Sequence, residues 1–269
     1  MSKNASFFMP GVSLFGANVL SELADRVTAL GGVKPLIVTD QGMTQMGYTK
    51  QITDLLEAAS IKYAVFDETV PNPTDTNVEQ GVAAYQDNQC DMLISLGGGS
   101  AHDCCKAVGL LVANGGSIAD YEGVDQLKKA LPPYIAINTT AGTASELTRF
   151  TIITNTSNHV KMAIVDWRVT PDLAINDPLL MMKMPPSLTA ATGMDALTHA
   201  VEAYVSTAAN PITDAVALQA MRLIAKYLRV AVARGDDLEA RDRMAYAQYL
   251  AGMAFNNAGL GHVHAMSHQ

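Results

Sequence analysis

The sequence is poor in cysteine and carries no local excess of positive charge. Its three cysteines are Cys90, Cys104 and Cys105, and none of them forms a CxxC pair. So few cysteines, odd in number, argue against a disulfide framework and favour a reducing compartment. The net charge is −8, and no cluster of lysine or arginine offsets it locally. Because an acidic surface repels phosphate, we expect no nucleic acid partner.

Long apolar runs are also absent. No run approaches the roughly 18 residues that a membrane span requires. Residues 1–6 do not show the charged and then apolar pattern of a secretion signal. We therefore expect a cytoplasmic protein with no membrane partner. Of the 269 residues, 49% are apolar and 16% are charged, which is the composition of a globular chain with one large domain or two modest ones.

Short apolar runs alternate with helix-like segments as far as residue 185. Apolar residues have helical spacing over residues 48–59 and 76–88, and residues 151–175 have the pattern of strands joined by turns. The apolar runs are residues 36–39, 63–66, 92–96 and 134–137. This alternation predicts a parallel sheet covered by helices, as in a Rossmann-like α/β domain.

The sequence becomes rich in alanine after residue 185, and its apolar residues take helical spacing. Pro186 and Pro211 each stand where a helix could begin. The helical stretches are residues 187–205, 211–233 and 238–254. We therefore predict two domains, an α/β domain over residues 1–185 and an all-α domain over residues 186–269.

Polar or glycine residues follow three of the predicted strands and together favour a dinucleotide. Residues 97–100 (GGGS) precede a helical stretch, so their amides and the helix N-terminus could approach a diphosphate closely. Asp40 could accept hydrogen bonds from an adenosine ribose and would repel the 2′-phosphate of NADP, which favours NAD. Residues 138–146 form a hydroxyl-rich loop at a third strand end. Each feature alone is also typical of a plain turn or cap, and GGGS is not the GxGxxG fingerprint.

Two pairs of potential metal ligands occur in the helical part. Asp195 and His199 have i, i+4 spacing, and so do His264 and His268. Residues at this spacing share one face of a helix, and imidazole and carboxylate groups suit zinc or iron. The neighbours of both pairs are largely apolar, where an unpaired charge would be costly. The spacing fits a metal site and a hydrogen-bonded pair equally well.

Four segments resemble the iron-containing (group III) NAD-dependent alcohol dehydrogenases, and the resemblance extends over essentially the whole chain. They are residues 95–104, 137–148, 188–204 and 251–269. Within that family the sequence is most similar to bacterial enzymes that act on ethanol, methanol and 1,3-propanediol. The resemblance implies a dehydroquinate synthase-like architecture and metal-assisted hydride transfer between NAD and a short-chain primary alcohol or its aldehyde. It also implies Fe²⁺ or Zn²⁺ as the metal and a homodimer or higher homo-oligomer.

The resemblance also assigns roles to individual residues. It implies that Asp195, His199 and His264 bind the metal, and that His268 is a catalytic histidine close to the metal and the nicotinamide. The implied cofactor contacts are Asp40, Asn72, Gly98, Gly99, Ser100, Thr139, Thr140, Thr148 and Lys161.

The sequence departs from the family pattern at two points. The fourth metal ligand of the family is a histidine in a PHG motif beyond the position of His264, and these 269 residues stop before such a motif. We therefore expect the helical domain to be truncated at its C-terminus and the activity to depend on residues beyond Gln269. His262 stands where the family usually has tyrosine, which adds a titratable group beside the metal helix.

Three other interpretations fit parts of the sequence. A glycerol dehydrogenase-like zinc enzyme would share the fold and the chemistry but not these motifs. A dehydroquinate synthase-like lyase would need phosphate-binding lysine and arginine residues around the site, and the metal helices carry almost none. A catalytically incompetent NAD-binding fragment would bind the cofactor without metal and without turnover.

Overall fold

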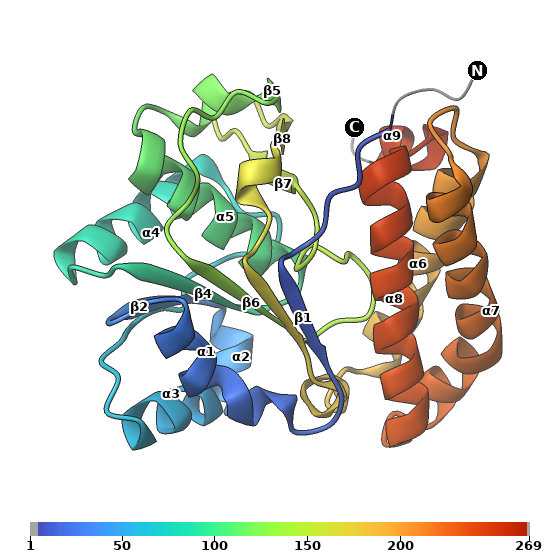
Figure 1. The fold of residues 1–269 in the computed structure, drawn as a ribbon, viewed down its shortest axis with the longest axis horizontal. Helices are drawn as coiled ribbons and strands as arrows, with labels where there is room; N and C mark the ends of the chain where they lie inside the picture. The colour runs from blue at the N-terminus through green and yellow to red at the C-terminus, as the bar shows by residue number, and fades with distance from the viewer. Residues whose placement is uncertain (1–4, 268–269) are drawn as a thin grey trace.

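The computed structural model describes residues 5–267 and places a parallel sheet with helices on both faces beside a bundle of helices (Figure 1). The sheet has six strands in the order β1-β9-β6-β4-β2-β3, and every neighbouring pair is parallel. The strands are β1 (Val12–Phe15), β2 (Pro35–Val38), β3 (Ala64–Phe66), β4 (Met92–Gly97), β6 (Tyr134–Asn138) and β9 (Leu173–Asn176). This arrangement confirms the predicted fold class, an α/β part followed by an all-α part.

Alternate residues of a strand enter two separate cores, because successive side chains of a strand point to opposite faces. Leu36 and Val38 of β2 belong to one core, and Ile37 between them belongs to the other. Helices cover both cores, which explains why the strands have continuous apolar runs. These helices are α1 (Leu23–Ala29), α2 (Gln41–Gln45) and α3 (Tyr48–Ala58) on one face, and α4 (Asp75–Asp87) and α5 (Gly99–Asn114) on the other.

A smaller sheet joins three strands in the order β5-β8-β7, and β7 and β8 run antiparallel. β7 packs against α5, so this sheet lies over the helix that follows the glycine loop. The predicted strands within residues 151–175 are thus confirmed. The bounds of this region and of the 3-10 helices are β5 (Gly123–Val124), β7 (Phe150–Thr154), β8 (Lys161–Val165), η1 (Val19–Glu22), η2 (Ile118–Tyr121), η3 (Trp167–Val169) and η4 (Pro178–Met181).

The helical part begins at Pro186 and packs three long helices against one another. Its helices are α6 (Pro186–Val205), α7 (Pro211–Ala233), α8 (Leu238–Ala258) and α9 (His262–Ser267). α8 continues past its predicted end at residue 254, until Gly259 takes a φ of 80° that favours glycine. None of the helices in the described part of the chain is both long and apolar enough to cross a membrane. That residues 1–185 and 186–269 are separate domains stays a prediction.

The loop that follows β6 fastens the sheet to the helical bundle. Gly252 of α8 lies so close to this loop that a Cβ added to it would be 2.4 Å from the Cβ of Ala144. Glu146 is fully buried in the same contact, and the side-chain amide of Gln248 on α8 donates a hydrogen bond to it at 2.6 Å. If the loop moved away from α8, the carboxyl group of Glu146 would lose its hydrogen bond or become exposed to solvent.

Replacement of Glu146 by glutamine is expected to change how stability depends on pH. Burial, the largest cause, raises the pKa of Glu146 to about 7, although the hydrogen bond from Gln248 acts in the opposite direction. Because the folded state favours the protonated acid, this group makes the wild type lose stability as the pH rises from about 4.5 to about 7. The loss amounts to about 3 kcal/mol, and Glu146→Gln should lack it in urea unfolding measured across this range.

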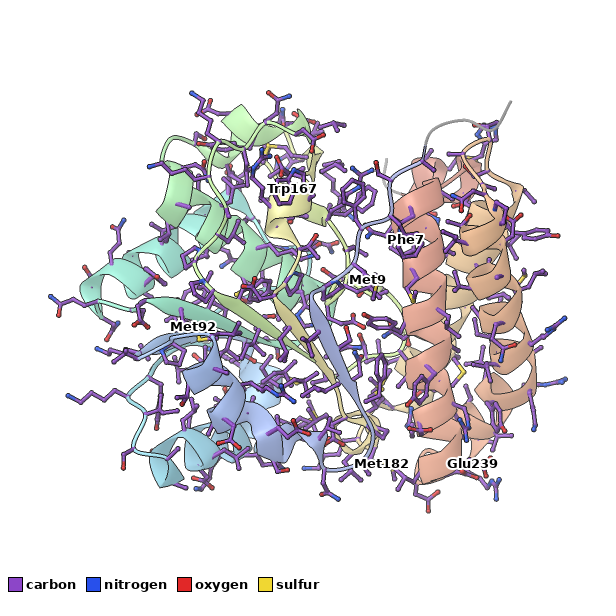
Figure 2. All side chains as sticks on the ribbon, in the orientation of Figure 1. Phe7, Met9, Met92, Trp167, Met182 and Glu239 are labelled. Carbon is purple, nitrogen blue, oxygen red and sulfur yellow. The ribbon has the colours of Figure 1, made fainter. Side chains whose placement is uncertain are left out.

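The matched control is Glu239→Gln. Glu239 is exposed near the start of α8 (Figure 2), whereas Glu146 is buried. The free energy of unfolding of this control should follow the wild type at every pH. Parallel pH profiles for Glu146→Gln and the wild type would contradict the prediction.

Candidate active site

The glycine loop between β4 and α5 is held against the loop that follows β6. Gly97 has a φ of 149°, in the region that favours glycine. A Cβ on Gly98 would lie 2.8 Å from the side chain of Thr140, and a Cβ on Gly99 would lie 2.9 Å from that of Thr143. The missing side chains therefore allow the two loops to meet at the carboxyl ends of β4 and β6, where parallel sheets bind ligands.

A cavity of about 820 Å³ lies at these strand ends. Its size falls within the range of protein ligand sites, about 300–1,000 Å³. Asp40 belongs to its lining and also caps α2, because its carboxylate accepts a hydrogen bond from the Met43 amide at 3.0 Å. The two interpretations of Asp40 from the sequence, cap and cofactor contact, are therefore compatible. The predicted cofactor residues in this lining are Asp40, Gly98, Gly99, Ser100, Thr139 and Thr140.

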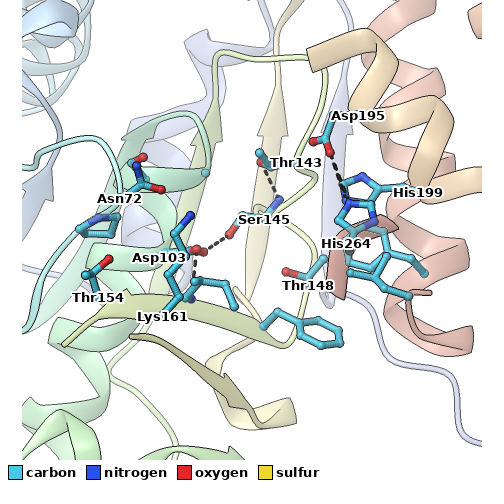
Figure 3. Close-up of a pocket in the computed structure, with 17 residues that line it drawn as sticks. Asn72, Asp103, Thr143, Ser145, Thr148, Thr154, Lys161, Asp195, His199 and His264 are labelled. Atoms are coloured by element: carbon cyan, nitrogen blue, oxygen red, sulfur yellow. Dashed lines mark hydrogen bonds and ion pairs between the residues drawn. The ribbon is translucent and has the colours of Figure 1, made fainter. Parts of the chain in front are cut away.

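A second cavity, of about 240 Å³, lies between the glycine loop, the small sheet and the helical bundle (Figure 3). It shares Gly99, Ser100 and Thr143 with the first cavity, so the two adjoin. The two linings together contain every predicted cofactor residue and every predicted metal ligand. The predicted residues in the second lining, apart from the shared ones, are Asn72, Thr148, Lys161, Asp195, His199 and His264.

The three predicted metal ligands converge at the helical side of the second cavity (Figure 3). α6 supplies Asp195 and His199, and α9 supplies His264. Asp195 Oδ1 lies 3.7 Å from His199 Nε2 and 3.4 Å from His264 Nε2. Ligand atoms that share one tetrahedral ion at about 2.0–2.2 Å lie about 3.3–3.6 Å apart, so this donor set fits zinc or iron. The predicted catalytic residue His268 lies outside the described residues, and His262 is exposed at the start of α9.

Aromatic stacking holds the two imidazoles in place. The ring of His199 stacks on that of His264, with centroids 4.4 Å apart, and on that of Phe255 at 4.2 Å. Burial, the largest cause, lowers the pKa of His199 to about 4, although Asp195 acts in the opposite direction. Burial also acts to lower the pKa of His264, but its hydrogen bonds with Asp195 and Glu202 outweigh this and raise it. His199 is therefore neutral at physiological pH, which is the form that binds metal ions.

Two charged residues of α5 that the sequence analysis did not single out organise the wall of the second cavity. Lys106 is fully buried, and its ammonium donates hydrogen bonds to the Ser145 hydroxyl at 3.0 Å and to the carbonyls of Thr148 and Phe150 at 2.9 and 2.8 Å. Asp103 accepts a hydrogen bond from the same Ser145 hydroxyl at 2.7 Å. Burial lowers the pKa of Lys106 to about 8. The signal in the sequence was a pair of charges within a largely apolar helix.

Replacement of His264 by alanine is expected to abolish tight binding of a divalent metal. Loss of a partner outside the ligand set costs about 10–100-fold in metal affinity, so loss of a ligand should cost more than about 100-fold. Competition with a chromophoric chelator measures the affinity for Zn²⁺, and metal analysis of anaerobically prepared protein measures retained Fe²⁺. His262→Ala, on the exposed side of the same helix, is the control and should bind as the wild type does. Equal metal content in His264→Ala and wild type would show that the cluster is not the metal site.

Comparisons with known proteins agree with the resemblance that the motifs indicated. The family profile described as "Iron-containing alcohol dehydrogenase" matches residues 10–178. The profile described as "Fe-containing alcohol dehydrogenase family, C-terminal" matches residues 189–269. The two profiles together cover most of the chain.

Relatives and solved structures give the same result. "Alcohol dehydrogenase 4" of Schizosaccharomyces pombe is 57% identical over 98% of this chain, which spans 63% of that protein. "NAD-dependent methanol dehydrogenase" of Bacillus methanolicus is 50% identical over 98% of this chain and 69% of its own length. The crystal structure of a 1,3-propanediol oxidoreductase matches with a TM-score of 0.97 and 53% identity, over 99% of this chain and 70% of that one. The chain belongs to the iron-containing alcohol dehydrogenase family.

Proposed function

We propose that this chain interconverts a short-chain primary alcohol and its aldehyde, with hydride transfer to or from NAD. The observation that carries the proposal is the pair of adjoining cavities, one at the glycine loop and one at the cluster of Asp195, His199 and His264. Because both cavities include Gly99 and Ser100, a dinucleotide bound at the glycine loop would extend toward the cluster. Membership of the family supports the same class of reaction.

The nucleotide end of these cavities fits NAD. Gly98 and Gly99 bring bare backbone to the lining of the first cavity, and a diphosphate needs such a close approach to backbone amides. Asp40 offers a carboxylate to ribose hydroxyls and opposes the 2′-phosphate of NADP. We propose that Asn72, Thr148 and Lys161, from the lining of the second cavity, contact the nicotinamide half. When bound, the nicotinamide supplies the hydride chemistry.

The cluster fits Fe²⁺ or Zn²⁺, which Asp195, His199 and His264 would hold. The Lewis acidity of either ion, when bound, lowers the pKa of an alcohol hydroxyl. Phe255 covers one side of His199 and so keeps water from that side of the cluster. We also propose that His268 relays the alcohol proton toward solvent.

Two alternatives make different demands on the same residues. A dehydroquinate synthase-like lyase would need several cations around the cluster, yet Lys161 is the only lysine or arginine among the described residues that line the second cavity. A catalytically incompetent NAD-binding fragment would bind the cofactor and hold no metal. Because the chain spans 63% of the length of its fission-yeast relative, activity of these 269 residues by themselves is part of the proposal.

The proposal predicts NAD reduction that requires both a metal and an alcohol. Anaerobically prepared chain is loaded with Fe²⁺ or Zn²⁺ and offered a panel of methanol, ethanol, 1-propanol and 1,3-propanediol. NADH formation, followed by absorbance, should appear with at least one short primary alcohol, disappear after chelation and return when the metal is restored. NAD binding without bound metal and without turnover would instead favour the incompetent fragment.

Replacement of Asp40 by asparagine should weaken the preference for NAD over NADP. Asparagine can keep the hydrogen bond to the Met43 amide that caps α2, but it lacks the negative charge that opposes a 2′-phosphate. We expect the ratio of the NADP and NAD dissociation constants to fall about tenfold, which is about 1.4 kcal/mol. Asp237→Asn, at the cap of α8, is the matched control because Asp237 accepts a similar hydrogen bond from the Ala240 amide. An unchanged ratio in Asp40→Asn would argue against a ribose contact.

We further propose that the protein is a cytoplasmic homo-oligomer. The thiols of Cys90, Cys104 and Cys105 are all buried and unpaired, which is compatible with a reducing compartment. The resemblance to the family supports a dimer or larger assembly. Light scattering should give a mass at least twice that of one chain, and a monomer at assay concentration would contradict the assembly.

A further inference from the structure

Glu202 lies on α6, on the same side of the helix as two of the metal-ligand candidates. Asp195, His199 and Glu202 are spaced i, i+4 and i+7, so they share one face. Glu202 is buried, with 6% of its surface exposed. Its Oε2 lies 2.5 Å from Nδ1 of His264, and its Oε1 accepts a hydrogen bond from the Val263 amide at 2.7 Å. One carboxylate therefore contacts both the side chain and the backbone of α9.

The two nitrogens of His264 face two different carboxylates of the same helix. Nδ1 faces Glu202 at 2.5 Å, whereas Nε2 faces Asp195 Oδ1 at 3.4 Å. Both carboxylates accept but do not donate a hydrogen bond, and the one beside Nδ1 is much the closer, so a neutral His264 carries its proton on Nδ1. The lone pair of a neutral His264 then lies on Nε2, which is the atom that joins Asp195 and His199 in the ligand cluster.

Hydrogen-bond donors surround the Glu202 carboxylate. They are the amides of Gly261 and Val263 and the ring of His264. A Cβ on Gly261 would lie 2.9 Å from Glu202 Oε1, so the chain passes close to the carboxylate at this glycine. Glu202 is thus held by the turn that begins α9 as well as by the imidazole.

We propose that Glu202 is the positioning residue of the metal site. It holds His264 in the tautomer with a proton on Nδ1 and aims Nε2 at the ligand cluster, while it does not itself bind the ion. Histidine ligands commonly donate their second ring N–H to a carboxylate in this way, and the loss of that carboxylate weakens metal affinity about 10–100-fold. The inference rests on the proposed metal site and adds a residue that neither the motifs nor the family assignment supplied.

Metal affinity is the first test. Zn²⁺ and Fe²⁺ dissociation constants are measured for wild type, Glu202→Gln and Glu202→Ala. Glutamine can still accept from Nδ1–H through its carbonyl, but it has no second acceptor for the Val263 amide, so it should retain part of the affinity. We expect about 10–100-fold weaker binding for Glu202→Ala and a smaller loss for Glu202→Gln. Affinities within twofold of the wild type for both variants would overturn the inference.

The matched control is Thr198→Ala. Thr198 lies on α6 between the ligand candidates, and its hydroxyl donates a hydrogen bond to the Met194 carbonyl of its own helix. This variant should bind metal as the wild type does. NAD affinity and far-ultraviolet circular dichroism show whether each variant is folded. If Glu202→Ala does not fold, the metal affinity of Glu202→Gln alone tests the inference.

The tautomer of His264 is the second test, and it needs no metal. Long-range ¹H–¹⁵N correlation spectra of the metal-free chain are recorded above the pKa of the ring, and His264→Ala identifies the signal. The wild type should show the tautomer protonated on Nδ1, and Glu202→Ala should shift toward protonation on Nε2. The same tautomer in both would overturn the inference. A wild type that binds no metal would overturn the proposed function. The tautomer measurement does not require metal, so it tests the inference about Glu202 separately.

Discussion

The whole site depends on backbone contacts that only glycine permits. Gly98 allows the glycine loop to meet Thr140, and Gly252 allows α8 to meet the same β6–β7 loop. At Gly142, an added Cβ would be 2.6 Å from the Cβ of Thr192 on α6. Residues 139–149 therefore line the first cavity and contact α6 and α8 as well. A larger side chain at Gly98 would separate the glycine loop from the β6–β7 loop, and one at Gly142 or Gly252 would separate the β6–β7 loop from α6 or α8.

Buried polar groups fix this loop from two sides. Lys106 donates hydrogen bonds to carbonyls at the C-terminal end of the loop. Gln248 donates one to the carboxyl group of Glu146, near the middle of the loop. A buried ionisable group costs free energy unless its partners stay in hydrogen-bonding positions. Each of these contacts therefore favours one conformation of the loop over other conformations. The apolar cores set how closely the layers pack, and these polar contacts set how the layers are aligned at the site.

The sequence predicted the parts of the site whose signals are local. Asp40 and the glycine loop directly follow apolar strands, and Asp195 and His199 are one helical turn apart. The fold class followed from the same alternation of runs, and the structure agrees with it. Glu202 and Lys106 could not be predicted in this way, because their partners are set by tertiary packing. The partner of Glu202 is 62 residues away in the chain, and the carbonyl of Phe150 is 44 residues from Lys106.

Asp40 lines a cavity and caps a helix, so the cofactor contact proposed for it and the stability of α2 depend on one side chain. The carboxylate that lines the first cavity is also the N-cap of α2, a helix of only five residues. Removal of a capping side chain costs about 1 kcal/mol of helix stability. If Asp40 contacts the cofactor as proposed, a substitution that favours NADP would also change the stability of α2. Substitutions that still cap, such as serine, threonine or asparagine, are the accessible routes at this position.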